Sequence, residues 1–131
     1  MSLKNSKESL LPELFQKDFG KSIVEQLDQH QHISVKGSAG SSVSLFITGL
    51  FLSQQKSVLY LVDDVEKALY ANTEMEDFVG RENVLYYPAS HLEPYQIEKI
   101  QNANLVLRTE VINALNSSSN PKVIVAFTGA L

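Results

Sequence analysis

The chain has 131 residues, of which 44% are hydrophobic and 20% are charged, and 11 Lys and Arg against 15 Asp and Glu give it a net charge of −4. This composition is typical of a soluble globular domain and excludes a disordered protein of low hydrophobicity. The absence of cysteine excludes disulfides and thiolate sites, and without a long apolar run or a signal peptide we expect a cytoplasmic protein with no membrane partner.

Helical and strand-like segments alternate along the chain. We expect residues 1–9 to be a flexible N-terminal segment and residues 10–131 to form one α/β domain. The elements predicted in chain order are a helix over residues 10–29, a strand over 32–36, a turn over 37–44, a helix over 45–55, a strand over 57–62, a helix over 63–79, a strand over 83–87, a loop over 89–95, a helix over 97–116 and a strand over 122–127. This order predicts a parallel sheet of about four strands with flanking helices.

Two of these predictions depend on specific residues. The run from Val58 to Val62 is continuously apolar or aromatic, which is typical of a strand buried on both faces of a parallel sheet. Asp63 follows it directly and is expected to cap the next helix, with Glu66 as its capping-box partner.

The most informative stretch is the turn between the strand predicted at 32–36 and the helix predicted at 45–55. Phosphate-binding loops follow the pattern G-x-x-x-x-G-K-[ST]. Gly37 matches the first glycine and Ser44 the closing hydroxyl, but Ser42 replaces the second glycine and Val43 replaces the lysine. Valine brings no charge to the phosphates, and serine disfavours a positive φ.

Two interpretations of this turn remain open: a tight turn capped by serine hydroxyls, or a degenerate phosphate loop. We do not expect either to bind ATP. The loop consists of Gly37, Ser38, Ala39, Gly40, Ser41, Ser42, Val43 and Ser44.

Residues 35–44 resemble the start of bacterial transcription-repair coupling factors (Mfd). The resemblance continues through residues 58–64, 83–88, 92–95 and 123–131, so it covers nearly the whole chain from about residue 10. That family begins with a module similar to the excision-repair helicase UvrB, in which the nucleotide loop is typically degenerate. The departures at Ser42 and Val43 therefore agree with the family, whereas UvrB itself keeps the lysine.

The resemblance implies a non-catalytic N-terminal fragment of a longer protein, with a sheet similar to part of a P-loop or RecA-like helicase domain. The parent would be an ATP-dependent DNA translocase that displaces RNA polymerase stalled at DNA damage and recruits nucleotide-excision-repair proteins. Its partners would be RNA polymerase, UvrA and duplex DNA, and ATP and Mg would bind its downstream motor. The fragment itself would contact other domains of the same chain and would need no cofactor.

Two other classes of function remain open from the sequence. One is a fragment of an active P-loop helicase or NTPase, which a lysine near the loop would favour and Val43 opposes. The other is a flavodoxin-like interaction module, which a fifth strand and a closing helix would favour.

The remaining candidate residues are better explained by structural roles. The acid at Asp63 resembles a Walker B residue that could hold Mg²⁺, but helix capping is the preferred role. His30 and His32 lack the partners of a metal site and are expected in solvent, and His91 and Glu93 are expected to pack in a loop. We therefore expect no catalytic residue and no metal site.

The sequence contains no cluster of consecutive lysines and arginines. The lysines and arginines are scattered along an acidic chain, so we expect little or no DNA binding by the fragment. Arg108, within the last predicted helix, is expected to be solvated or to cap that helix.

Overall fold

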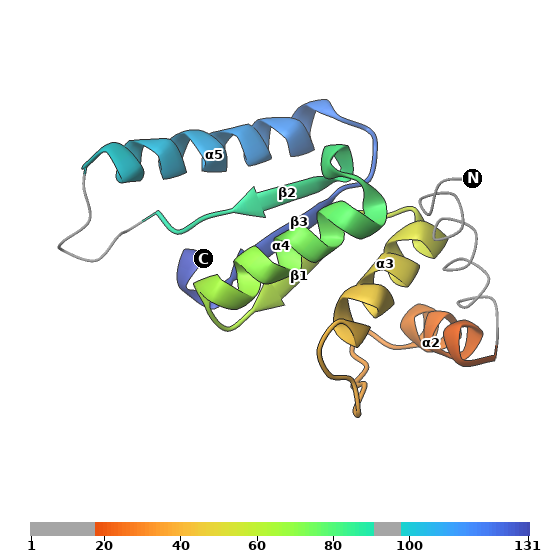
Figure 1. The fold of residues 1–131 in the computed structure, drawn as a ribbon. Coiled ribbons are helices and arrows are strands. Elements are labelled where there is room, and N and C mark those ends of the chain that lie inside the picture. The colour runs from red at the N-terminus through yellow and green to blue at the C-terminus, as the bar shows by residue number, and fades with distance from the viewer. Residues whose placement is uncertain (1–17, 91–97) are drawn as a thin grey trace, which may run out of the picture. The chain divides into compact units, whose positions relative to one another are not determined.

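The computed structural model describes residues 18–90 and 98–131, and the chain divides into two units, Met1–Gln55 and Lys56–Leu131, here called unit 1 and unit 2 (Figure 1). The flexible segment expected at residues 1–9, the start of the first predicted helix, and the pair His91 and Glu93 lie outside the described residues. No described helix is both long enough and apolar enough to cross a bilayer.

Unit 1 contains two described helices, α2 (Asp18–Gln29) and α3 (Ser42–Gln54). In α2 the buried Ile23 contrasts with exposed polar neighbours, as expected of an amphipathic helix. In α3 the apolar residues are spread around the whole helix, and the hydroxyl of buried Thr48 donates to the Ser44 carbonyl at 2.8 Å. The helix ends at Gln55, whose left-handed backbone (φ 50°) lets its N–H donate to the Phe51 carbonyl.

The segment between α2 and α3 differs from the prediction. Residues 32–36 form no strand in the structure. Within this segment Ile33 is half-buried and the other four side chains are exposed, including Val35 at 41%. A strand is stabilised by a partner strand and by a buried face, and these residues bury almost none of their surface.

Unit 2 is built on a parallel sheet of three strands, β1 (Val58–Val62), β2 (Val84–Tyr87) and β3 (Val123–Phe127). β3 lies between the other two, in the order β1-β3-β2, and Val123 is in register with both Val58 and Val84. The predicted α/β class with a parallel sheet and flanking helices is therefore confirmed, with three strands formed by the described residues.

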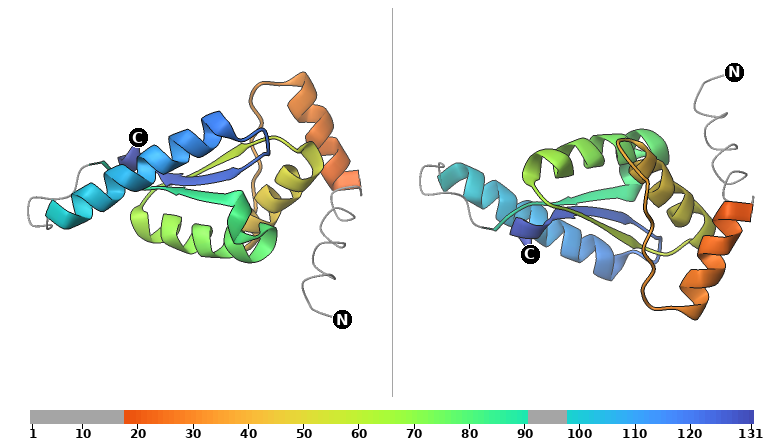
Figure 2. Two further views of the ribbon diagram at one scale, coloured as in Figure 1. Left: turned by 90° about the horizontal axis from the view of Figure 1, so that it is seen from above. Right: turned by 90° about the horizontal axis from the view of Figure 1, so that it is seen from below.

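Helices connect these strands on opposite sides of the sheet. α4 (Val65–Val79) and the short η1 (Arg81–Asn83) join β1 to β2, and α5 (Glu98–Ser117) precedes β3, which is followed by η2 (Thr128–Ala130). The connection from β1 to β2 passes over the position of β3, and the connection from β2 to β3 runs in the opposite direction across the sheet. Two crossovers of the same hand therefore place α4 and α5 on opposite faces of the sheet (Figure 2).

The core of unit 2 lies between α4 and β3. Ala68, Ala71 and Met75 of α4 are buried, as are Val123 and Val125 of β3. Small residues on the helix allow it to approach the sheet closely, and the larger Met75 fills the remaining space.

Candidate functional site

The turn at residues 37–44 has glycines where its backbone requires them. Gly37 has φ +87° and Gly40 has φ +56°, and a Cβ built at either position would meet nothing within 4 Å. These glycines are therefore needed for backbone conformation and not for space. Ser42, in contrast, is the first residue of α3 and has no positive φ, so a glycine is not required at this position of the loop.

The hydroxyl of Ser42 closes the turn onto Ala39. It accepts a hydrogen bond from the Ala39 N–H at 2.9 Å and donates one to the Ala39 carbonyl at 2.7 Å. The N–H of Ser42 also donates to the Ala39 carbonyl, and the N–H of Val43 donates to that of Gly40, each at 3.3 Å. Backbone groups that a phosphate loop presents to its ligand are here used within the turn.

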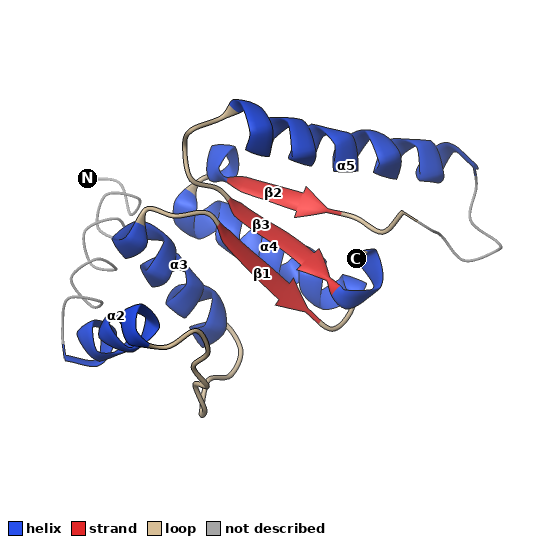
Figure 3. Cartoon of the chain, turned by 180° about the vertical axis from the view of Figure 1, so that it is seen from behind, coloured by secondary structure: helices blue, strands red, loops and turns tan. Residues whose placement is uncertain are grey.

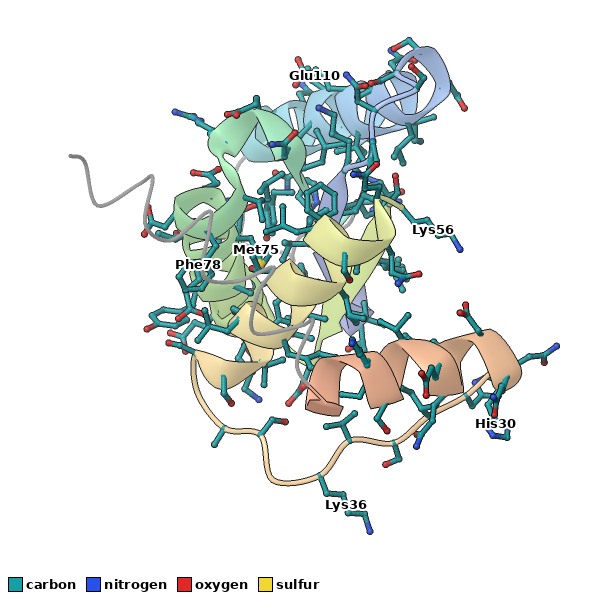
Figure 4. All side chains as sticks on the ribbon, turned by 90° about the vertical axis from the view of Figure 1, so that its right-hand side faces the viewer. His30, Lys36, Lys56, Met75, Phe78 and Glu110 are labelled. Carbon is teal, nitrogen blue, oxygen red and sulfur yellow. The ribbon has the colours of Figure 1, made fainter. Side chains whose placement is uncertain are left out.

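The loop carries no cation. Val43, at the lysine position, has a half-buried side chain, and Lys36, just before the loop, is exposed and points away from it (Figure 4). The loop therefore precedes the start of a helix but holds no charge that could offset the β- and γ-phosphates of a nucleotide.

A small cavity of about 230 Å³ lies between α2 and the segment that leads to this loop. It is lined by Ser22, Ile23, Gln26, Ile33, Ser34, Val35 and Lys36. Ligand pockets in proteins are usually roughly 300–1,000 Å³ and have several convergent polar groups. At this volume the cavity is too small for a nucleotide, and Lys36 is the one cation in its lining.

The helix-capping role predicted for Asp63 belongs to its neighbour. Asp64, not Asp63, is the N-cap of α4: its carboxylate accepts a hydrogen bond from the Lys67 N–H at 2.9 Å, and the expected capping box with Glu66 does not form. Asp63 has an extended neighbour at Asp64 (φ −138°, ψ 169°), which moves the helix start one residue later.

Asp63 instead forms a surface ion pair with Lys67, whose ammonium also lies 3.6 Å from Asp64. The hydrogen bond from Lys67, with its positive charge, lowers the pKa of Asp63 below its usual 3.8, and the same hydrogen bond raises the pKa of Lys67 above 10.5. The hydroxyl of Thr128 donates to the Asp63 carbonyl at 2.9 Å, so the residue after β1 is tied to the residue after β3.

No three His, Asp or Glu side chains of the described residues come together as metal ligands would. His30 and His32 are both exposed, as expected from the sequence.

Arg108 has a role that the sequence did not indicate. It is half-buried, and its guanidinium donates to the carbonyls of Pro88 at 2.9 Å and Ala130 at 2.7 Å while lying over the Tyr87 ring. The interpretation of Arg108 as a solvated or helix-capping residue is therefore wrong. Beside Tyr87, burial raises the pKa of Tyr86, as expected for a phenol removed from water.

Comparisons of this chain with protein-family models, with curated proteins and with solved structures found no match. Hypotheses about its function therefore depend on the geometry of residues 37–44 and on the sequence resemblance described above.

Proposed function

We propose that this chain is the non-catalytic N-terminal domain of a bacterial transcription-repair coupling factor. In this proposal the parent protein uses ATP to displace RNA polymerase stalled at damaged DNA, and it recruits UvrA and the other excision-repair proteins. The parent's downstream motor binds ATP and Mg, while this UvrB-like domain contacts other parts of the same chain.

The observation that carries this proposal is the state of residues 37–44. Gly37, at the first glycine position of the pattern, and Gly40 give the segment before α3 two positive φ angles, and α3 begins at Ser42. Ser42 occupies the Ala39 N–H, and Val43 provides no cation. This combination supports a domain that descends from a nucleotide-binding fold, and it opposes the alternative of an active P-loop NTPase, whose loop needs both the free amides and the lysine.

Titration of the chain with Mg-ATP tests the non-catalytic part of the proposal. We expect no heat of binding in isothermal titration calorimetry with nucleotide at millimolar concentration. Binding with micromolar affinity would contradict the proposal and would favour the active NTPase.

The role of the parent protein requires a genetic test. In a strain that lacks the gene encoding this chain, we expect the transcribed strand of active genes to lose its faster repair after ultraviolet irradiation, and the intact gene should restore it. Equal strand-specific repair rates with and without the gene would overturn the assignment to this family. Helicase motifs encoded downstream of Leu131 are also expected.

A further inference from the structure

β1 is an outer strand of the sheet in unit 2, and its backbone shows which residues face outward. The N–H of Val58 donates to the Lys122 carbonyl at 2.9 Å, so the backbone groups of Val58 point toward β3. Successive residues of a strand alternate in direction. The N–H and C=O groups of Leu59 and Leu61 therefore point away from β3, to a side where the described residues place no further strand.

The same two leucines expose their side chains. Leu59 is 56% exposed and Leu61 is 43% exposed, although both lie in the interior of strand β1. α4 packs against the other face, and α5 lies beside β2, so in Figure 3 no helix of unit 2 stands in front of the outer strand β1. A strand with open amides and exposed leucines, and without Pro or Lys in its interior, readily pairs with another strand.

The ends of β1 carry opposite charges that make it complementary to itself. Lys56 precedes the strand and is exposed. Asp64, whose carboxylate also caps α4 and lies 3.6 Å from the Lys67 ammonium, follows the strand with an extended backbone. In an antiparallel pair of two copies centred on Tyr60, Leu59 lies opposite Leu61 of the second copy, and Lys56 lies opposite Asp64 of the second copy.

This register also matches the backbone. The backbone N–H and C=O groups of Leu59 and Leu61 point away from β3, so each residue can exchange two hydrogen bonds with the residue opposite it in the second copy. A register centred on Leu59 places Lys56 opposite Val62, and one centred on Leu61 places Leu59 opposite Asp63. The register centred on Tyr60 alone joins leucine to leucine and cation to anion, which are favourable cross-strand pairs.

We infer that β1 is a homodimerisation edge, at which two copies of this chain pair their β1 strands antiparallel around a two-fold axis at Tyr60. The pairing joins two three-stranded sheets into one sheet of six strands. A two-fold interface must be complementary to itself, which the leucines and the charged ends of β1 satisfy. The inference stands apart from the proposed function, since it uses none of the residues of the loop at 37–44.

Sedimentation equilibrium of the 131-residue chain over a wide concentration range tests this inference. We expect the average mass to rise toward that of a dimer with increasing concentration. Leu61→Pro removes one outward N–H, which an outer strand tolerates, and Leu61→Lys places a charge on the open leucine cluster. Each should raise the dimer dissociation constant at least tenfold. The control is Tyr70→Lys, at a residue of α4 that is 66% exposed, and it should leave the constant unchanged.

A charge variant and an amide measurement make the test specific to the register. Lys56→Glu faces Asp64 of the second copy, so it should weaken the dimer several-fold, with a smaller effect at high salt. Hydrogen exchange should show the amides of Leu59 and Leu61 becoming protected as the concentration rises. Circular dichroism confirms that each variant is folded.

Three results would overturn the inference. The first is a monomer at every concentration with these two amides exchanging freely. The second is a monomer in which they are protected, because another segment then covers the edge. The third is a dimer that Leu61→Pro and Leu61→Lys leave intact, because it then forms through another surface.

Discussion

The guanidinium carbon of Arg108 lies 4.1 Å from the centre of the Tyr87 ring. Tyr87 is the last residue of β2, and the same guanidinium donates to the carbonyls of Pro88, which follows β2, and Ala130, which follows β3. One side chain of α5 therefore joins the ends of two adjacent strands. Asn104, one turn earlier, adds a hydrogen bond to the Ala89 carbonyl at 3.3 Å.

Arg108→Ala should lower the stability of unit 2 by about 1–3 kcal/mol. A hydrogen bond from a charged donor contributes about 1.5–3 kcal/mol and a cation–π contact about 0.5–1 kcal/mol, and water replaces part of both. Urea unfolding followed by circular dichroism measures the change. Arg108→Lys should recover only part of the loss, because an ammonium cannot stack on the ring and serve two carbonyls in the same geometry.

Glu110→Ala is the matched control for this prediction. Glu110 is exposed on the same helix, and its replacement should change the stability by less than about 0.5 kcal/mol. If Arg108→Ala has an equally small effect, the contacts of Arg108 do not stabilise the fold.

The ion pair between Asp63 and Lys67 predicts a small dependence of stability on pH. The folded-state pKa of Asp63 is depressed below 3.8, so its contribution is present above that value and is lost as the pH falls through the folded-state pKa. The pKa of Lys67 is raised above 10.5, so its contribution is present below that value and is lost as the pH rises through the folded-state pKa.

Lys67→Gln should therefore destabilise the chain slightly near neutral pH, and less in strong acid, where Asp63 is protonated in both chains. The backbone N–H of residue 67 still serves the Asp64 cap, so the variant removes only the ion pair. Urea unfolding near pH 7 and at a pH below the folded-state pKa of Asp63 measures both differences, and Lys21→Gln, at another exposed lysine, controls for the lost charge. A deficit that is the same at both pH values would contradict the assignment to this pair.

The isolated chain should bind duplex DNA weakly and without sequence preference. Its net charge is −4 and its lysines are scattered, so few counterions are released on binding. Fluorescence anisotropy with a labelled duplex should give little binding at physiological salt. A submicromolar dissociation constant that rises steeply with salt would show a basic face that the sequence does not indicate.

The strands of unit 2 show what the sequence could predict. The apolar run gave the position of β1 to within one residue, because a continuous run of this kind is a local property. Its expected burial on both faces was wrong, since Leu59 and Leu61 are exposed. Coverage of a face depends on where the helices lie, and the position of β3 between β1 and β2 depends on contacts across more than sixty residues of sequence.

The candidate site likewise combines features that follow from local residue preferences with contacts that depend on the fold. The positive φ angles at Gly37 and Gly40 agree with a preference intrinsic to glycine, whereas residue 42, where the pattern has a glycine, has no positive φ. The hydrogen bonds of Ser42 to Ala39 and those of Arg108 to Pro88 and Ala130 were not predictable, since a serine in a turn and an arginine in a helix each have many polar partners within reach.

Restoring the two missing parts of the loop tests whether its phosphate-binding shape survives. Ser42→Gly frees the Ala39 N–H, and Val43→Lys supplies the absent cation. A charge-assisted hydrogen bond contributes about 1.5–3 kcal/mol, so the double variant should bind ATP or pyrophosphate about tenfold to a hundredfold more tightly than the unaltered chain. Each single variant should gain less, because one leaves the charge missing and the other leaves the amide occupied. Calorimetric titration measures the affinities.

The control for this double variant is Ser38→Gly with Leu45→Lys, which adds the same residue types at positions where the phosphate-loop pattern requires neither glycine nor lysine, and it should gain nothing. Hydrolysis is not expected in either chain, because the Walker B-like acid Asp63 is paired with Lys67. If Ser42→Gly with Val43→Lys folds normally by circular dichroism and still gains no affinity, the loop has lost its geometry together with its charge. Its resemblance to a phosphate loop would then describe the ancestry of this chain and not a latent binding site.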